Sequence, residues 1–146
     1  QEPDWYLKEI MGEREAQLNP LRSFVDNGIV ISAGSDSPCT DPDPMLWIHN
    51  ACNHPVQNQA LTLDEAMRMA TYWGYWTSFD EKERGSLETG KIADMVILGE
   101  NPYAVPKDRL KEIPVEQLIL NGKPYEKQSG SWVGMVIRGL FGSKKI

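Results

Sequence analysis

The stretch Gly28-Ile29-Val30-Ile31-Ser32-Ala33-Gly34-Ser35-Asp36-Ser37-Pro38 places an apolar run directly before a turn of small residues that carries one carboxylate. Residues 29–34 are predicted to form a short buried strand. A strand that is apolar on both faces is typical of a parallel sheet covered by helices, in which active groups collect at the carboxyl ends of the strands. Asp36 stands at such an end and is a candidate catalytic residue, although an Asp in this position is also a common turn former or helix cap.

The residues on either side of this stretch carry helix signals. Residues 20–27 read as a helix with Pro20 at its first turn, closed by Gly28 in the left-handed conformation. After the turn, Asp43 precedes Pro44, and we expect Asp43 to cap a helix that ends near residue 53. The stretch therefore joins two helices through a buried strand and a stiff, proline-rich loop.

Two further parts of the chain carry clear local signals. Thr62 and Glu65 form a capping box, which begins a helix expected to run from Leu63 to about Phe79. Strands are expected at 93–98 and 115–120, and Asn121-Gly122 is a hairpin signal that leads into a third strand. The glycine-rich turn at 85–91 fits no phosphate-binding fingerprint, and Asp94 is expected to tie this turn to a neighbouring backbone.

Four of these segments together resemble the carboxy-terminal portion of a metal-dependent amidohydrolase. They are residues 30–38, Asp43-Pro44, the helix start at 61–66 and Gly85 to Leu98, which reads GSLETGKIADMVIL. The resemblance is to the branch named amidohydrolase 3, which includes N-substituted formamide deformylase-like enzymes, and covers about Trp5 to Tyr125. It implies that Asp36 approaches a catalytic metal and handles the proton of the hydrolytic water. One or two divalent cations, most often zinc, would lower the pKa of that water.

The resemblance implies an α/β parent fold, a TIM barrel with a small β-sandwich beside it. A complete barrel needs about 250 residues, so 146 residues correspond to a fragment of that architecture. We expect residues 1–80 to form the end of the barrel, residues 81–126 half of the sandwich domain, and residues 127–146 a tail. In isolation this combination of the last βα part with a partial β-sandwich is an α+β fold.

The resemblance also implies a function, the hydrolysis of a non-peptide C–N bond of the amide or formamide type in a small-molecule substrate. The His-x-His metal motif of such enzymes is absent, so the chain alone is expected to bind no metal and to be inactive. The alternative is a non-catalytic structural or oligomerisation module. Strand edges left without partners favour self-association under either interpretation.

The two histidines, His49 and His54, are five residues apart at a helix end and do not share a face as a metal pair would. A metal carrier that uses both with Cys39 is a third alternative, which the spacing of these residues does not favour. Related enzymes commonly have Thr-Arg where this chain has Asn53-His54. His54 is therefore a candidate substrate-binding residue, with a solvated histidine at a helix end as the alternative.

Composition excludes several classes of function. The net charge of −6 argues against a nucleic-acid partner, and no apolar run approaches the roughly 20 residues of a membrane span. The polar, acidic start is unlike a signal peptide, and Cys39 and Cys52 lack the spacing of a metal knuckle, so we expect free thiols and a cytoplasmic location. The tail could lie on a membrane surface, but its glycines favour docking on the protein's own surface.

Overall fold

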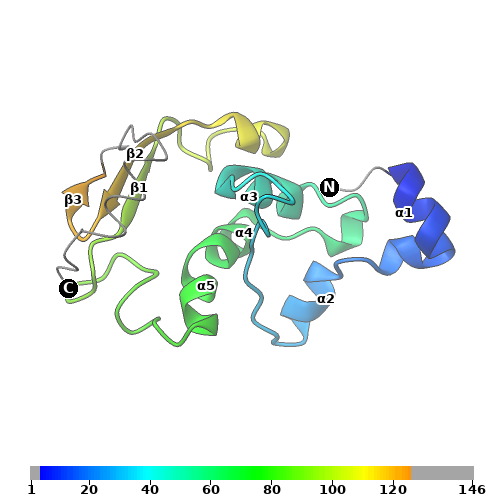
Figure 1. Ribbon diagram of the computed structural model, residues 1–146, viewed down its shortest axis with the longest axis horizontal. Coiled ribbons are helices and arrows are strands. Elements are labelled where there is room, and N and C mark those ends of the chain that lie inside the picture. Colours follow the sequence, from blue (N-terminus) through cyan, green and yellow to red (C-terminus); the bar gives the residue numbers. More distant parts are fainter. Residues whose placement is uncertain (1–3, 126–146) are drawn as a thin grey trace, which may run out of the picture.

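The computed structural model describes residues 4–125 and has an α+β arrangement (Figure 1). A small sheet lies at one end, the α1 helix lies at the other, and α3 and α4 lie between them. The elements in chain order are α1 (Asp4–Met11), the 3-10 helix η1 (Gly12–Gln17), α2 (Leu21–Asp26), α3 (Pro44–Cys52), η2 (Gln57–Gln59), α4 (Leu63–Ala70), α5 (Tyr72–Thr77), β1 (Met95–Leu98), η3 (Lys107–Glu112), β2 (Val115–Leu120) and β3 (Lys123–Pro124).

The core lies where α3 packs against α4 and η3. Two leucines are its most completely buried large side chains: Leu61, in the segment before α4, is 1% exposed, and Leu110 of η3 is 0% exposed. Burial of such side chains from three separate segments provides the main hydrophobic stabilisation of the fold. The other buried core residues are Met45, Ile48, Ala51 and Cys52 of α3, Ala66 and Met69 of α4, and Ile113.

The helix predicted over residues 20–27 is confirmed as α2. Gly28, which follows it, has the expected positive φ of 73°. The strand expected at 29–34 does not form. These residues run alongside α4, where the Ala33 amide donates to the Met69 carbonyl oxygen at 3.2 Å, and Ile29 is 50% exposed. The physical reason is that a strand needs a neighbouring strand, and none lies beside this segment in the described part of the chain.

Both predicted helix caps are confirmed. The Asp43 carboxylate accepts from the Met45 amide at 2.9 Å, and the Thr62 and Glu65 side chains form the reciprocal capping box of α4. Glu65 also accepts a bidentate pair of hydrogen bonds from the Arg22 guanidinium. The same carboxylate therefore caps α4 and holds α2 against it.

The helix predicted over residues 63–79 is interrupted, and this corrects the sequence expectation. Thr71 leaves the helical region, with φ −131° and ψ −95°, so α4 ends at Ala70 and α5 begins at Tyr72. The Thr71 hydroxyl donates to the Met67 carbonyl oxygen at 2.7 Å and takes the place of the amide that a continuous helix would use. The Thr71 amide turns to the Arg68 carbonyl oxygen instead.

The three predicted strands form one antiparallel sheet in the order β1-β2-β3. Val96 pairs with Leu118 in β1 and β2, and Leu120 pairs with Lys123 across the hairpin. Asn121 and Gly122 have φ values of 56° and 75°, as a two-residue hairpin of this twist requires. The described residues thus contain a single sheet of the expected partial sandwich, with β1 at one edge.

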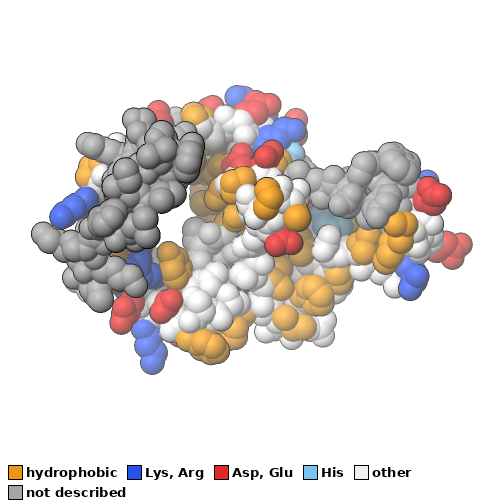
Figure 2. Space-filling view, viewed as in Figure 1, with side chains coloured by type: hydrophobic (Ala, Val, Ile, Leu, Met, Phe, Trp, Pro, Cys, Tyr) orange, Lys and Arg blue, Asp and Glu red, His pale blue; other side chains and the backbone are white. Residues whose placement is uncertain are grey.

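Apolar side chains remain exposed at several positions, and two regions contain more than one of them. One is the sheet, where Val96 is 53% exposed; the other lies over α2 and α5, where Trp76 is 45% and Phe79 88% exposed. Figure 2 shows hydrophobic side chains gathered along the lower edge of the molecule, in the region of these two helices. No helix within residues 4–125 is long and apolar enough to cross a membrane. The predicted tail, residues 127–146, lies outside the described residues.

Candidate functional site

The turn that carries Asp36 closes on itself through local hydrogen bonds. The Cys39 amide donates to the Asp36 carbonyl oxygen at 2.9 Å, and the Thr40 hydroxyl donates to the Ser35 carbonyl oxygen. Asp36 has a φ of 52°, a left-handed conformation that Asp tolerates better than most residues. The backbone of the turn is therefore held in place by its own residues.

The Asp36 side chain is exposed, and its carboxylate forms no hydrogen bond or ion pair with the residues that the structure describes. A carboxylate that caps no helix and pairs with no cation is available to accept a proton or to bind a cation. Of the two alternative structural roles, Asp36 does lie in a turn, where its carbonyl oxygen accepts from Cys39, but it caps no helix, because Asp43 caps the helix that follows. Asp36 thus lies where the sequence places it, at the end of the apolar segment.

The loop between Asp36 and α3 is held to that helix by a side-chain hydrogen bond. The Trp47 indole donates to the Asp41 carbonyl oxygen at 3.3 Å, which ties the loop to α3. Asp41 is exposed. Of the carboxylates in this loop, Asp43 has a structural role and Asp41 keeps an uncommitted side chain, as Asp36 does.

Both histidine rings contact residues that are close to them in the sequence. The His54 Nδ1 atom lies 3.1 Å from the Val56 amide nitrogen, and the His49 ring lies beside Asn53 at the end of α3. The structure thus shows how these rings are held by local backbone and amide groups. It brings neither of them to Asp36 through a hydrogen bond, and the substrate-binding role of His54 stays a prediction.

Residues 4–125 do not assemble the ligands of a metal ion. No group of three or more His, Cys, Asp or Glu side chains lies close enough together there to hold one. Zinc sites take three or four protein ligands, so Asp36 with this set of neighbours does not fit such a site. The described residues therefore do not provide a complete set of zinc ligands by themselves.

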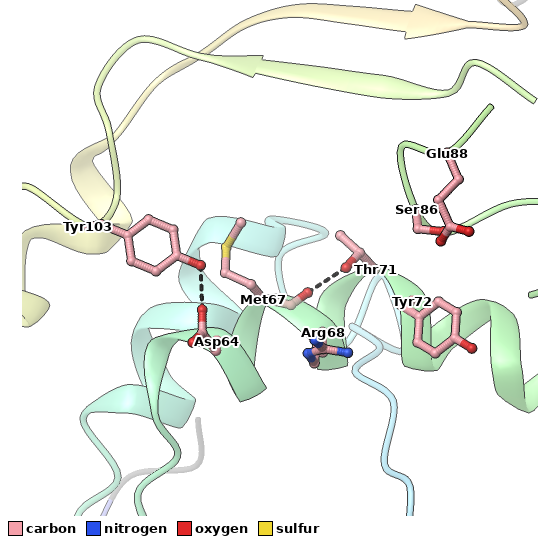
Figure 3. Close-up of a pocket in the computed structure, with 9 residues that line it drawn as sticks. Asp64, Met67, Arg68, Thr71, Tyr72, Ser86, Glu88 and Tyr103 are labelled. Carbon is pink, nitrogen blue, oxygen red and sulfur yellow. Dashed lines mark hydrogen bonds between the residues drawn. The ribbon is translucent and has the colours of Figure 1, made fainter. Parts of the chain in front are cut away.

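A separate hollow of about 530 Å³ opens between α4 and the loops that flank β1 (Figure 3). On one side the Tyr103 hydroxyl donates to Asp64 at 2.6 Å, which raises the pKa of Tyr103 because the bond favours the protonated phenol. On the other side Ser86 donates to Glu88 at 2.6 Å, and this bond, followed by the charge of Lys91, lowers the pKa of the Glu88 carboxyl. The other lining residues are Met67, Arg68, Thr71, Tyr72 and Gly85.

Sequence reasoning did not anticipate this hollow. Tyr103 meets Asp64 across 39 positions of sequence, and the helix-start motif that contains Asp64 gives no indication of this partner. The expectation for Asp94, which follows the glycine-rich turn at 85–91, is tested by the structure. Asp94 accepts from the Asn121 amide at 2.7 Å and pairs with Arg84, which confirms that it ties this turn to a neighbouring backbone.

Comparison with known proteins identifies the family of this chain. The sequence profile of the amidohydrolase family, Amidohydro_3, matches residues 2–125. This chain belongs to the amidohydrolase family. The match includes the Asp36 turn, the capping box of α4 and the turn around Asp94, which are the segments on which the resemblance was based.

Two curated relatives and one solved structure extend this finding. The N-substituted formamide deformylase of Arthrobacter pascens is 32% identical over 129 residues, which are 82% of this chain and 24% of that protein. A 5-methylthioadenosine/S-adenosylhomocysteine deaminase of Caldanaerobacter subterraneus is 30% identical over 119 residues, 71% of this chain and 28% of that protein. The crystal structure of an amidohydrolase from Thermotoga maritima superposes with a TM-score of 0.59 at 17% identity, covering 75% of this chain and 26% of that one.

The superposition on the solved amidohydrolase shows that the fold of this chain is similar to part of that structure. This chain spans about a quarter of the length of each of these relatives. The α+β piece described above therefore corresponds to part of an amidohydrolase.

Proposed function

We propose that this chain forms the carboxy-terminal part of a metal-dependent amidohydrolase that hydrolyses a non-peptide C–N bond in a small-molecule substrate. The family match and the formamide deformylase among the relatives support an amide or formamide type of bond. The proposal includes a TIM barrel and a small β-sandwich in the complete enzyme. The described chain would contribute the last helices of that barrel and one sheet of the sandwich.

The observation that carries the proposal is the free carboxylate of Asp36 on a locally braced turn within the family match. A positioned carboxylate can accept a proton from water as the C–N bond is attacked and return it to the leaving amine nitrogen. The exposed side chain leaves room for both water and substrate. We assign Asp36 this role as general base and acid.

A divalent cation, zinc, is part of the proposal for the complete enzyme. The residues described here do not fit a zinc site by themselves, because they offer no three clustered ligands. Asp36 would be one ligand, and the others would come from outside residues 4–125. The isolated chain is therefore proposed to be inactive.

The test is to express the complete open reading frame that contains these residues and to assay N-substituted formamides and other small amides for amine release. We expect activity, and Asp36→Asn is expected to lower kcat by about 100-fold or more, the typical contribution of general acid–base catalysis. Asp41→Asn is the matched control, since Asp41 is an exposed carboxylate in the same loop. Full activity of Asp36→Asn would contradict the assigned role.

A second candidate function is a non-catalytic structural or oligomerisation module. The exposed apolar residues of the sheet, Val96 and Leu120 among them, favour it for the chain on its own. Under this proposal the chain self-associates through strand β1, whose outer edge has no neighbour among the described strands. Sedimentation velocity over a range of concentrations distinguishes a monomer from a self-associating chain.

A further inference from the structure

The side chain of Thr40 closes the turn that carries Asp36. Its hydroxyl donates to the Ser35 carbonyl oxygen, five positions back in the chain. Inside this closure, the Cys39 amide donates to the Asp36 carbonyl oxygen at 2.9 Å. The two hydrogen bonds are nested, so residues 36–39 form a loop whose two ends are joined by the Thr40 side chain.

Burial separates the base of this turn from its tip. Ser35 and Thr40 are half-buried, whereas residues 36–39 are exposed. A hydrogen bond that is shielded from water is electrostatically stronger than one that water surrounds. The bond from Thr40 to Ser35 therefore anchors the turn at its base, and the exposed Asp36 carboxylate is held from there.

The acceptor of this bond belongs to the peptide group that joins Ser35 to Asp36. Because a peptide group is planar, a bond that fixes its carbonyl oxygen also fixes the plane of the Asp36 amide. The direction of the Asp36 side chain then depends on the φ angle of that residue, which is 52°. This left-handed value is disfavoured for residues with a Cβ atom and persists where neighbouring contacts hold the backbone. Loss of the Thr40 donor would free this peptide group to rotate and to move the carboxylate with it.

The residues that follow Thr40 are anchored in turn to α3. The Trp47 indole of that helix donates to the Asp41 carbonyl oxygen at 3.3 Å. The Asp43 amide donates to the same oxygen at 2.8 Å. All of these bonds lie within residues 35–47, so this support of the turn is independent of the parts of the enzyme that lie outside this chain.

We propose that Thr40 is a positioning residue for Asp36. Its hydroxyl holds the backbone of the turn so that the Asp36 carboxylate stays aimed at the hydrolytic water while it accepts the proton and returns it. Thr40 itself transfers no proton and acts only through the Ser35 peptide group. This inference rests on the proposed role of Asp36 as general base and acid.

Steady-state kinetics of the complete enzyme test this role. Thr40→Val removes the hydroxyl at nearly constant shape and is expected to lower kcat by about tenfold, with KM changed by less than about twofold. The reason is that a catalytic group displaced by about 1 Å loses up to about 100-fold in rate, whereas substrate binding is untouched. Thr40→Ser keeps the hydroxyl and is expected to restore kcat to within about threefold.

The matched control is Ser78→Ala. The Ser78 hydroxyl donates to the Tyr75 carbonyl oxygen at 3.1 Å, a local bond of the same kind that lies outside the turn. This variant is expected to leave kcat and KM unchanged. Unchanged kcat in Thr40→Val, or failure of Thr40→Ser to restore it, would overturn the inference.

A double-mutant cycle separates positioning from a general loss of structure. A residue that acts only through Asp36 loses its effect when Asp36 is replaced, so adding Thr40→Val to Asp36→Asn is expected to lower kcat by less than about twofold further. A further tenfold loss would overturn the inference. Full activity of Asp36→Asn would reject the proposed function and this inference with it, whereas an inactive Asp36→Asn beside a fully active Thr40→Val would reject the inference alone.

Hydrogen exchange of the Cys39 amide, measured by NMR on the 146-residue chain, is a readout that needs no activity. Thr40→Val is expected to speed this exchange at least about fivefold, because the turn opens more often, and Ser78→Ala is expected to leave it unchanged. The amides of α3 report whether each variant is folded, and Thr40→Ala replaces Thr40→Val if that variant is not. An unchanged rate at Cys39 in a folded variant without the hydroxyl would overturn the inference.

Discussion

At the scale of single residues, Glu65 illustrates how one side chain serves several elements. Its carboxylate caps α4 through the Thr62 amide at 2.8 Å and receives the Arg22 guanidinium from α2. The hydrogen bonds from Arg22, followed by those from Thr62, lower the pKa of Glu65 to about 2. The capping box was evident from spacing alone, but the partner in α2 was not, since Arg22 is 43 positions away.

This pKa has a consequence for stability. A carboxylate whose folded-state pKa lies below its unfolded value stabilises the fold above the unfolded pKa, and this contribution is lost as the pH falls through the folded pKa. We therefore expect the free energy of unfolding to decline between about pH 4.5 and pH 2. Because both side chains are partly exposed, the loss is about 1 to 2 kcal/mol.

Urea denaturation at a series of pH values measures this effect. Glu65→Gln should be less stable than the unmodified chain at pH 7 and should lack this part of the pH dependence. Asp26→Asn is the control, because Asp26 also pairs with Arg22, at 3.2 Å, but is 59% exposed. An unchanged pH profile in Glu65→Gln would show that the Arg22 pair contributes nothing.

At the scale of elements, turns and caps follow from local sequence, whereas element limits depend on neighbours. The hairpin at Asn121-Gly122 forms as predicted because two positive φ values are a local requirement. The strand expected at 29–34 does not form, because pairing is not a local property. The helix over 63–79 divides at Thr71, where a hydroxyl replaces an amide at the Met67 carbonyl oxygen.

Gly85 offers a test of packing between the glycine-rich turn and α5. A Cβ atom at Gly85 would lie 3.0 Å from the Tyr75 ring and 3.1 Å from the Tyr72 backbone, and its φ is +89°. Gly90 has a similar φ of +95° but open space around it. Gly90→Ala is expected to cost about 1 kcal/mol from backbone strain alone, and Gly85→Ala about 1 to 3 kcal/mol more from the close contacts.

Thermal and urea unfolding of the two alanine variants provide the comparison. Equal losses of stability in Gly85→Ala and Gly90→Ala would show that the turn moves away from Tyr75 at no cost. A larger loss at Gly85 supports tight packing of the turn on α5.

The core where η3 meets α3 and α4 gives a second prediction at this scale. Leu110 is 0% exposed, so Leu110→Ala should destabilise the fold by about 2 to 5 kcal/mol through lost burial and a residual cavity. Leu87→Ala, at a position 76% exposed, should change the free energy of unfolding by less than about 0.5 kcal/mol. A small effect at Leu110 would mean that η3 is not part of the cooperative core.

At the scale of the whole molecule, the chain is part of an amidohydrolase whose described residues lack a complete ligand set. After extensive dialysis we expect less than about 0.1 zinc per chain, because structural and catalytic zinc sites need three or four protein ligands. Plasma mass spectrometry measures this, and Asp36→Asn should not change the result. About one zinc per chain would contradict the expectation and would point to a site built by Asp36, the histidines or Cys39.

The sequence by itself determined the features that depend on a few adjacent residues. These are the caps at Asp43 and Thr62, the left-handed Gly28, the hairpin at residues 121–122 and the family resemblance of the segment 30–38. Their conformations follow from backbone sterics and hydrogen bonds within a few positions of the chain.

Only the tertiary structure decided which segments meet. It left residues 29–34 without a neighbouring strand, joined Arg22 to Glu65, brought Tyr103 to Asp64 and left Val96 and Leu120 of the sheet exposed. Such contacts join residues tens of positions apart, and they form because packing of the whole chain outweighs the weak preference of any single segment.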